Sequence, residues 1–427
     1  MVDIYNNMER LKIKAYNTLR WSEKYLKTDM VYLAKGGFWL SLNQVISTAA
    51  SLILLVSFAN FISAETYGNY RYILSVIGIL VIGTFPGINT IAIKAVAEAK
   101  ESIFWHLVYK KSYLTLISSL LCFIASTYYY LNDNQTLALS FIIAGIGIPF
   151  SYTFGMYESL ILGRKDFKTM SKLNSLSKII TTISTISTIY LTDNILALVT
   201  AYFVPQIIIQ GIFLIYFYLN KVPQTIDGEY GKKLTNFGYH LSFMEILKTI
   251  AGQIDKLLIF HYLGAGQLAL YAIATAPPGQ IKTILQNLTT LATPKMSTSK
   301  ADDIKNTLLN KLFRLEIIMV FCVVAYWVIT PFIFPIFFPK YTEAILISQV
   351  YALSLLFFPR TFLSTAMTAH LKQKELYFIR IFAPSARIII FFIALPLWGI
   401  WGAVIGSIAS NLATTVIYQY YFKKAFA

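Results

Sequence analysis

The stretch FWLSLNQVISTAASLILLVSFANF, residues 38–61, contains no Lys, Arg, Asp or Glu. An α-helix of about 20 residues crosses the roughly 30 Å hydrocarbon core of a bilayer, so an apolar run of this length predicts a transmembrane helix. Similar runs recur between short polar breaks and predict twelve spans, at residues 38–61, 68–97, 110–131, 136–162, 168–191, 195–219, 237–262, 267–293, 307–334, 343–369, 375–395 and 399–422. We therefore expect an all-α membrane protein with twelve transmembrane helices.

The composition of the chain agrees with this expectation. Of the 427 residues 56% are hydrophobic and only 13% are charged, about half the charged fraction of a soluble protein. The net charge of +16 does not indicate a nucleic-acid partner, because the basic residues lie between apolar segments and not on one soluble face. The two cysteines, Cys122 and Cys322, both lie in apolar runs, so neither a Cys/His metal site nor a disulfide framework is expected.

The distribution of basic residues predicts the topology. The two terminal segments and every second connection together hold 26 Lys and Arg residues, whereas the alternate connections hold one, Lys340. Since cytoplasmic loops carry the excess of Lys and Arg, both termini are expected in the cytoplasm. Residues 1–36 are predicted to form an amphipathic helix on the inner surface of the membrane, and residues 220–236 a cytoplasmic linker.

An internal repeat divides the chain into two halves. At an offset of 201 residues the first and seventh spans match without gaps: Gly37, Leu40, Ser41, Thr48, Ala50, Ile53, Ala64 and Tyr70 meet Gly238, Leu241, Ser242, Thr249, Ala251, Ile254, Ala265 and Tyr271. Two copies of six helices enter the membrane from the same side, which is typical of parallel repeats around a cavity. We expect two parallel six-helix bundles, residues 37–219 and 237–427, around a central cavity.

Charged residues inside the predicted spans are the candidate site residues. Each costs roughly 2.5 to 3.5 kcal/mol at the centre of a bilayer, so such residues are expected to face a polar cavity or an ionic partner. Nine cations and four acids lie in or at the ends of spans, which leaves a net positive interior that would attract phosphate. The predicted cavity cations are Lys248, Lys256, Lys282, Arg360 and Arg387, with interhelical ion pairs as the alternative. Arg71 and Arg380 are expected to extend from helix ends to the membrane surface.

Two groups of motifs resemble the polysaccharide repeat-unit (O-antigen) flippases of the multidrug/oligosaccharidyl-lipid/polysaccharide exporter superfamily. The first is Ala64-Glu65-Thr66-Tyr67-Gly68-Asn69-Tyr70 followed by Phe85-Pro86-Gly87-Ile88-Asn89-Thr90 and Lys94. The second is Gln253-Ile254-Asp255-Lys256-Leu257-Leu258-Ile259 with Leu263-Gly264 and Tyr271-Ala272-Ile273-Ala274. Carried onto this sequence, the motif-matching charged positions are Lys94, Asp255 and Lys256, and Lys94 is thereby added to the predicted substrate-binding cations.

The resemblance implies a fold like that of multidrug and toxic compound extrusion (MATE) transporters. It also implies alternating-access transport of an undecaprenyl-diphosphate-linked oligosaccharide from the inner to the outer leaflet of the bacterial cytoplasmic membrane. A polysaccharide polymerase and a chain-length regulator are the further partners it implies. Glu158 and Asp255 are the candidates for coupling to a proton or a sodium ion. A structural role for Glu158 is the alternative.

Two other functions are weighed against this one. A MATE-type drug or cation antiporter usually holds a carboxylate in the membrane, and the first span contains none. A membrane enzyme of polysaccharide assembly would need a sizeable outer loop, whereas every connection predicted to face outward is shorter than about ten residues, and no nucleotide-binding loop is found. We therefore expect a transporter without a catalytic site or an organic cofactor.

Overall fold

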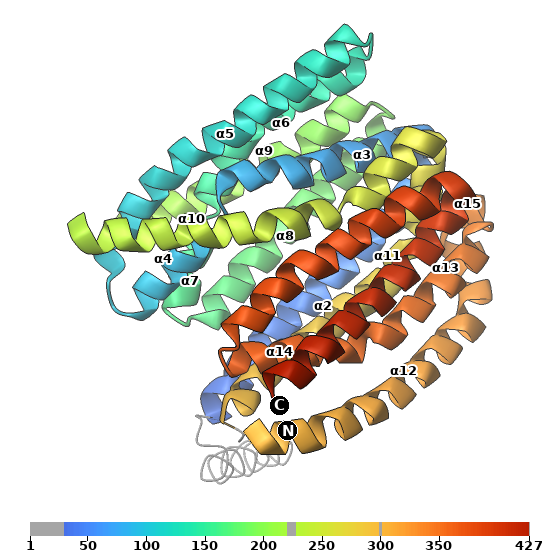
Figure 1. Cartoon of the computed structure of the whole chain (residues 1–427). Coiled ribbons are helices and arrows are strands. Elements are labelled where there is room, and N and C mark those ends of the chain that lie inside the picture. The colour runs from blue at the N-terminus through green and yellow to red at the C-terminus, as the bar shows by residue number, and fades with distance from the viewer. Residues whose placement is uncertain (1–29, 220–227, 299–300, 427) are drawn as a thin grey trace, which may run out of the picture.

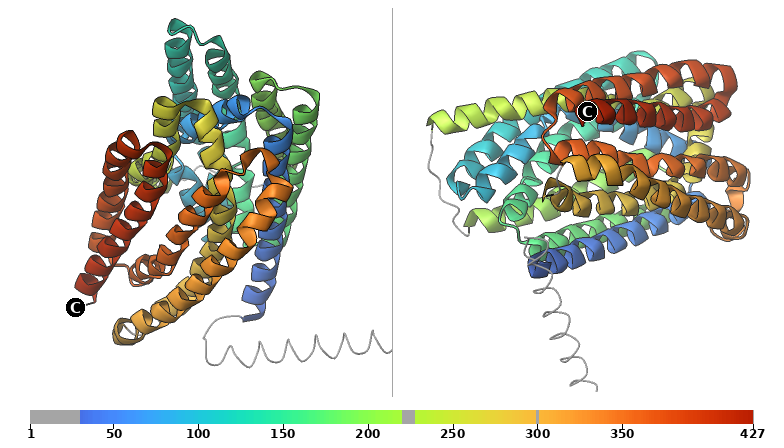
Figure 2. Two further views of the ribbon diagram at one scale, coloured as in Figure 1. Left: turned by 90° about the vertical axis from the view of Figure 1, so that its right-hand side faces the viewer. Right: turned by 60° about the horizontal axis from the view of Figure 1, so that its bottom comes forward.

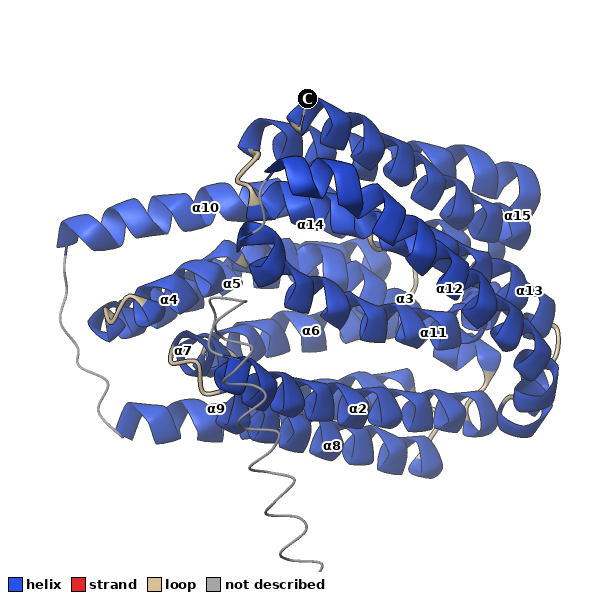
Figure 3. Ribbon diagram, turned by 90° about the horizontal axis from the view of Figure 1, so that it is seen from below, coloured by secondary structure: helices blue, strands red, loops and turns tan. Residues whose placement is uncertain are grey.

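The computed structural model of the chain describes residues 30–219, 228–298 and 301–426. The described residues are almost entirely helical, and none of them lies in a β-strand (Figure 3). This confirms the predicted all-α class. The predicted amphipathic segment lies outside the described residues except for residues 30–36, which begin the first described helix. Of the predicted linker, residues 228–236 are helical and the rest lies outside the described residues.

The first half of the chain forms the following α-helices: α2 (Met30–Phe61), α3 (Ala64–Leu80), α4 (Gly87–Ala97), α5 (Phe104–Leu131), α6 (Gln135–Phe154), α7 (Tyr157–Gly163), α8 (Phe167–Leu191) and α9 (Ile195–Leu219). The second half forms α10 (Gly228–Ala251), α11 (Ile254–Thr298), α12 (Ala301–Phe337), α13 (Ala344–Ala352), α14 (Thr361–Ala369) and α15 (Gln373–Ala425). Short 3₁₀ segments connect some of them: η1 (Val81–Thr84), η2 (Glu101–Ile103), η3 (Pro339–Tyr341) and η4 (Leu353–Arg360).

Every predicted span falls on helix, and several spans are bent or broken. The second predicted span consists of α3, η1 and α4, bent by 53°. Proline cannot continue an α-helix from the preceding turn, and the break holds Pro86 next to Phe85, whose φ of 51° is left-handed. Lys111 of α5 is buried against this break, with its Nζ 3.4 Å from the Phe85 carbonyl oxygen. Lys111 is one of the 26 basic residues that the predicted topology assigns to terminal segments and connections.

Two helices fold back on themselves at glycines. The φ angle is 84° at Gly264 of α11 and 56° at Gly399 of α15, and each marks a kink between two helical stretches. Both segments of 53 residues that contain these glycines pass a test of length and hydropathy for membrane spans. That test finds eight such segments among the described residues, or nine with the bent α3–α4 pair. The count of twelve crossings therefore stays a prediction.

The connections gather at two ends of the molecule (Figure 1). One end, which we call the basic end, holds the C-terminus and the connections at residues 98–103, 164–166 and 370–372. The opposite end holds the short turns at residues 62–63, 132–134, 192–194, 264, 338–343 and 399. Side chains cap several of the helices that begin there or at the basic end; for example, Asn134 accepts a hydrogen bond from the Leu137 N–H and Asp166 one from the Thr169 N–H, at 3.0 Å each.

Most helices pack within their own half of the chain, as α5 does on α6, α2 on α8 (Figure 3) and α11 on α15. Along one side the halves are joined because α3 and α4 lie against α11 and α10. Gly68 and Gly87 make this contact possible: a Cβ atom at Gly68 would lie 1.9 Å from the Ala265 carbonyl oxygen, and one at Gly87 would lie 2.1 Å from that of Gly238. We call this contact the glycine seam.

On the other side the halves touch at the opposite end. The Asn60 Nδ2 donates a hydrogen bond of 2.9 Å to the Phe337 carbonyl, and the Lys340 Nζ donates one of 2.7 Å to the Asn60 carbonyl. We call this contact the Asn60 latch. In the left view of Figure 2, α2 and α12 approach each other at their upper ends and diverge toward the end that carries the C-terminus. The helices α2 and α12 are therefore farther apart at the basic end than at the Asn60 latch.

Candidate functional site

A cavity of about 490 Å³ lies between the two halves, and both of them line it. The first half contributes residues of α2, α3, α8 and α9, and the second half contributes residues of α11, α13 and α15. Its charged lining residues are Arg71, Lys178, Lys256 and Arg387, together with one acid, Asp255. The cavity therefore carries a net positive charge of three, and this charge lies where the two halves face each other.

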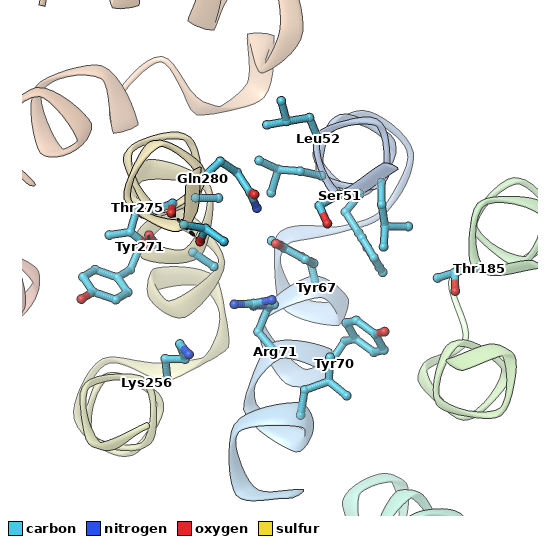
Figure 4. Close-up of a pocket in the computed structure, with 18 of the residues that line it drawn as sticks. Ser51, Leu52, Tyr67, Tyr70, Arg71, Thr185, Lys256, Tyr271, Thr275 and Gln280 are labelled. Carbon is cyan, nitrogen blue, oxygen red and sulfur yellow. Dashed lines mark hydrogen bonds between the residues drawn. The ribbon is translucent and has the colours of Figure 1, made fainter. Parts of the chain in front are cut away.

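Arg71 of α3 and Lys256 of α11 lie near each other in the cavity (Figure 4). The charge of Lys256 interacts with those of Arg71, Arg387 and Asp255, and the Lys256 Nζ donates a hydrogen bond of 2.7 Å to the Gln253 Oε1. We call Arg71, Lys256 and Arg387 the cation cluster. Like charges repel at short range, especially away from water, so this arrangement favours an anion between them.

Asp255 offsets part of that charge. Its Oδ2 lies 3.5 Å from the Arg387 Nη2 and accepts a hydrogen bond of 3.0 Å from the Tyr271 hydroxyl. This bond joins the two arms of α11 across the turn at Gly264. Asp255 is buried and Arg387 is three-quarters buried, so each partner shields the other from the cost of an isolated charge in the membrane.

Hydrogen-bonding capacity remains unused in the cluster. The Nε atoms of Arg71 and Arg387 and the Oδ1 of Asp255 are buried, and none of the three has a hydrogen-bond partner among the described residues. Most buried polar groups in proteins are hydrogen-bonded, and unused guanidinium donors suit a planar or tetrahedral oxyanion. The site is therefore suited to hold an anion such as a phosphate.

The wall formed by α8 is different in character. Lys178, Thr181, Thr182 and Thr185 all line the cavity, and their spacing places them on one face of the helix. Figure 4 shows Thr185 across the cavity from Lys256 and Tyr271. Tyr202 of α9 also lines the cavity. The cavity thus has a cationic wall at α11 and a wall rich in hydroxyl groups at α8.

The structure brings together some of the residues predicted from the sequence. Lys256, Arg387 and Asp255 line the cavity. Lys282 of α11 is not among the lining residues, although its charge interacts with that of Arg387. A role for these residues in binding substrate or a coupling ion stays a prediction.

Other predicted residues lie outside the cavity lining. Lys94 is more than half exposed, 3.9 Å from Glu98, and Lys248 is 70% exposed and pairs with Glu245 at 2.9 Å. Arg360 forms a two-pronged ion pair with Glu316 of α12, with one contact at 2.8 Å. Arg360 thus forms the interhelical ion pair that was the alternative to a place in the cavity. Glu158 is in contact with Tyr157 and lies away from the cavity.

Two cavity cations were not selected from the sequence. Arg71 was expected to extend to the surface because it lies near the end of its span, yet α3 places it at the centre of the site between Tyr67 and Lys256 (Figure 4). Lys178 was counted but not singled out. A usable pattern was present, because Lys178, Thr181, Thr182 and Thr185 share one face of the helix predicted at residues 168–191.

Comparisons with known proteins agree with this geometry. The family profile described as "Polysaccharide biosynthesis protein" matches residues 33–300, which is more than half of the chain. No curated protein matches the chain by sequence.

Solved structures show the same fold. The structure of the lipid II flippase MurJ in an inward closed conformation has a TM-score of 0.71 and 14% identity, over 90% of this chain and 88% of that one. The inward-facing conformation of a multidrug resistance MATE family transporter of the MOP superfamily has a TM-score of 0.67 and 13% identity, over 91% and 98%. An outward-facing MATE conformation has a TM-score of 0.61 and 12% identity, over 92% and 95%.

The fold resemblance implied by the motifs is thereby confirmed, and these structural neighbours are a lipid II flippase and multidrug transporters. The apolar helices mark a multi-pass membrane protein. The chain therefore belongs to the polysaccharide biosynthesis protein family, and it has the fold shared by MurJ and the MATE transporters.

Proposed function

We propose that this protein transports undecaprenyl-diphosphate-linked oligosaccharides, of O-antigen or a related surface polysaccharide, from the inner to the outer leaflet of the bacterial cytoplasmic membrane. The observation that carries the proposal is the cation cluster with its unused guanidinium donors at the interface of the two halves. A diphosphate that crosses a membrane needs compensating charge, and a hydrogen bond to a charged group contributes about 1.5 to 3 kcal/mol.

The proposed mechanism is alternating access. The basic end faces the cytoplasm in this proposal, as the distribution of basic residues predicts. The diphosphate enters the cavity where the halves diverge, and the cation cluster binds it. The halves then close at the basic end and separate at the Asn60 latch, which opens the cavity to the outer leaflet. A polymerase and a chain-length regulator receive the product there.

Coupling to a proton or a sodium ion is part of the proposal. Asp255 already has Arg387 as its counter-ion, so a cation would have to displace an arginine there. Glu158 is the other carboxylate proposed for this role, since no ion pair of Glu158 is found within the part of the chain that the structure describes.

The test is glycan export in cells that depend on this chain. Arg71→Gln and Arg387→Gln should each leave the protein in the membrane at normal amounts and lower surface glycan at least tenfold, the effect of about 1.4 kcal/mol. The lipid-linked intermediate should accumulate in the cytoplasmic leaflet. Arg314→Gln, a change at an exposed cation on α12, is the matched control and should export normally.

A drug or cation antiporter is the competing function. Such a transporter would bind organic cations, which the positive cavity repels. If Arg71→Glu and Arg387→Glu left glycan export intact while export of a cationic dye rose, the flippase proposal would be wrong and the antiporter would replace it.

A further inference from the structure

The α8 wall of the cavity carries a cation, Lys178, that is not part of the proposed diphosphate site. Lys178 is half-buried in the cavity lining. Within residues 30–219, 228–298 and 301–426 no ion pair or hydrogen bond of Lys178 is found. The charge of Lys256 interacts with the other two cluster cations and not with Lys178, which places Lys178 apart from the cluster.

A count of charges shows what remains after the diphosphate has bound. A diphosphate esterified at both ends carries roughly two negative charges, one on each phosphate. The cation cluster together with Asp255 has a net charge of two, because the three cations are offset by one acid. The diphosphate therefore balances the cluster, and Lys178 is left without a counter-ion. A charge without a partner in such a place is costly, so the bound substrate should supply one more anion.

The side chains beside Lys178 indicate which part of the substrate brings that anion. The Thr181 hydroxyl donates to the Ser177 carbonyl at 2.8 Å, and the Thr185 hydroxyl donates to the Thr181 carbonyl at 2.9 Å. Because their protons are used within the helix, both oxygens remain as acceptors for hydroxyl groups of the substrate. Sugars supply such hydroxyl groups. Tyr202 adds an aromatic ring to the same side of the cavity.

We propose that the transported glycan contains a sugar with a carboxylate, and that Lys178 binds this carboxylate while Thr181, Thr182 and Thr185 bind the neighbouring hydroxyl groups. The cavity then has two sides with different roles. The side that carries the cation cluster holds the diphosphate, and the α8 side selects the glycan by its charge. This inference rests on the proposed flippase function.

Two synthetic probes that differ in one group test the inference. Both probes are farnesyl diphosphates; one is esterified to glucose and the other to glucuronic acid. Their binding to the purified full chain is measured by competition against a fluorescent prenyl diphosphate ester. The wild-type chain should bind the glucuronic acid probe about tenfold more tightly, as expected for one added charge-assisted hydrogen bond. In Lys178→Gln this preference should vanish, and in Lys178→Arg, which keeps the charge, it should remain.

A control on the same helix separates this effect from a general loss of charge. Lys172 is exposed on α8, with its Nζ 5.9 Å from the centre of the Trp39 ring, and Lys172→Gln should keep the preference. Arg387→Gln should weaken the binding of both probes because it removes part of the diphosphate site.

The outcomes distinguish this inference from the function on which it rests. If the wild-type chain bound both probes equally, the acidic sugar would be wrong and the flippase function would stand. Equal weakening of both probes by Lys178→Gln would assign Lys178 to the diphosphate and would also overturn the inference. If neither probe bound, the proposed function itself would fail. Should Lys178→Gln not fold, Lys178→Met, which also removes the charge, should lose the preference, and a preference kept in Lys178→Met would overturn the inference.

Discussion

Arg360 shows how a charged residue inside a membrane span can serve the fold. Its side chain is 18% exposed and that of Glu316 is 23% exposed, and the two-pronged pair ties η4 to α12. Loss of one partner from such a partly buried pair should lower the free energy of unfolding by about 1 to 3 kcal/mol, between the values for exposed and fully buried pairs. Arg360→Gln and Glu316→Gln should each lower the thermal unfolding temperature in detergent.

The double variant distinguishes a structural pair from a transport residue. Arg360→Gln combined with Glu316→Gln leaves no unpaired charge, so it should recover most of the lost stability, and a double-mutant cycle measures the coupling. If Arg360→Gln kept full stability but abolished export, and the double variant did not recover it, Arg360 would bind substrate after all.

Lys94 and Lys248 test where the substrate path ends. Both are exposed and paired with a carboxylate on their own helix, Glu98 and Glu245, and such surface pairs contribute only about 0 to 1 kcal/mol. Lys94→Gln and Lys248→Gln should therefore retain more than half of wild-type glycan export, measured beside Arg387→Gln. A loss as large as that of Arg387→Gln would extend the path to these positions, as the motif resemblance implies for Lys94.

The sequence predicts the net positive charge of the cavity better than it predicts which residues line the cavity. Charged residues within apolar spans are costly and few, so Asp255, Lys256 and Arg387 could be selected from the sequence alone. Partners are set by helices distant in sequence: Arg360 pairs with Glu316, 44 residues away, and the charge of Arg71 interacts with that of Lys256 in the other half of the chain. No local pattern encodes these contacts. Burial of Arg71 likewise depends on α11, which packs over it from the other half of the chain.

At the scale of helices, the glycine seam makes a strong prediction. A methyl group at position 68 would overlap the backbone of Ala265, so Gly68→Ala must separate α3 from α11, at a cost of about 1 to 3 kcal/mol by analogy with overpacked cores. Gly266→Ala is the matched control, because a Cβ atom at position 266 would meet nothing within 4 Å.

We expect Gly68→Ala to lower both the unfolding temperature and glycan export, and Gly266→Ala to change neither. Equal behaviour of the two variants would show that the halves do not meet closely at Gly68.

The existence of the helices was predictable and their breaks were not. Each helix could be predicted from the length of its apolar run, because the thickness of the hydrocarbon core sets the length of a transmembrane helix. Pro86-Gly87 hints at the bend between α3 and α4, but the reversal at Gly399 had to be read from two adjacent apolar runs. The repeat places a break at equal positions in both halves, since residue 63 between α2 and α3 corresponds to Gly264 at an offset of 201. The bend at Phe85, by contrast, has no counterpart in the second arm of α11, where Gly264 is the one non-helical position among the described residues of that helix.

For the whole molecule, the Asn60 latch should hold the state seen here. In a chain with Cys122→Ala and Cys322→Ala, a reducible thiol crosslinker between Asn60→Cys and Lys340→Cys should stop glycan export, because the halves can no longer separate at that end. Reduction of the crosslink should restore export. The measurement is surface glycan before and after crosslinking and after reduction.

A crosslink within one half is the control for this experiment. Trp327 of α12 donates a hydrogen bond of 2.7 Å to the Gln349 carbonyl of α13, so both positions belong to the second half and are accessible. Crosslinked Trp327→Cys and Gln349→Cys should export normally. Export that continued with residues 60 and 340 joined would mean that transport does not need this end to open.

The net positive cavity also bears on the energy supply of the cell. A cavity that is wide enough for a glycan is also wide enough for hydrated ions. Gradients of protons and sodium ions maintain the voltage across a bacterial membrane. Fixed positive charge along a pathway raises the barrier for small cations. With Asp255 neutralised by Arg387, the cavity of this protein offers such cations no free carboxylate among its lining residues. The same arginines and lysines that we propose to bind a diphosphate should thus also limit leakage of small cations, which would preserve the voltage across the membrane.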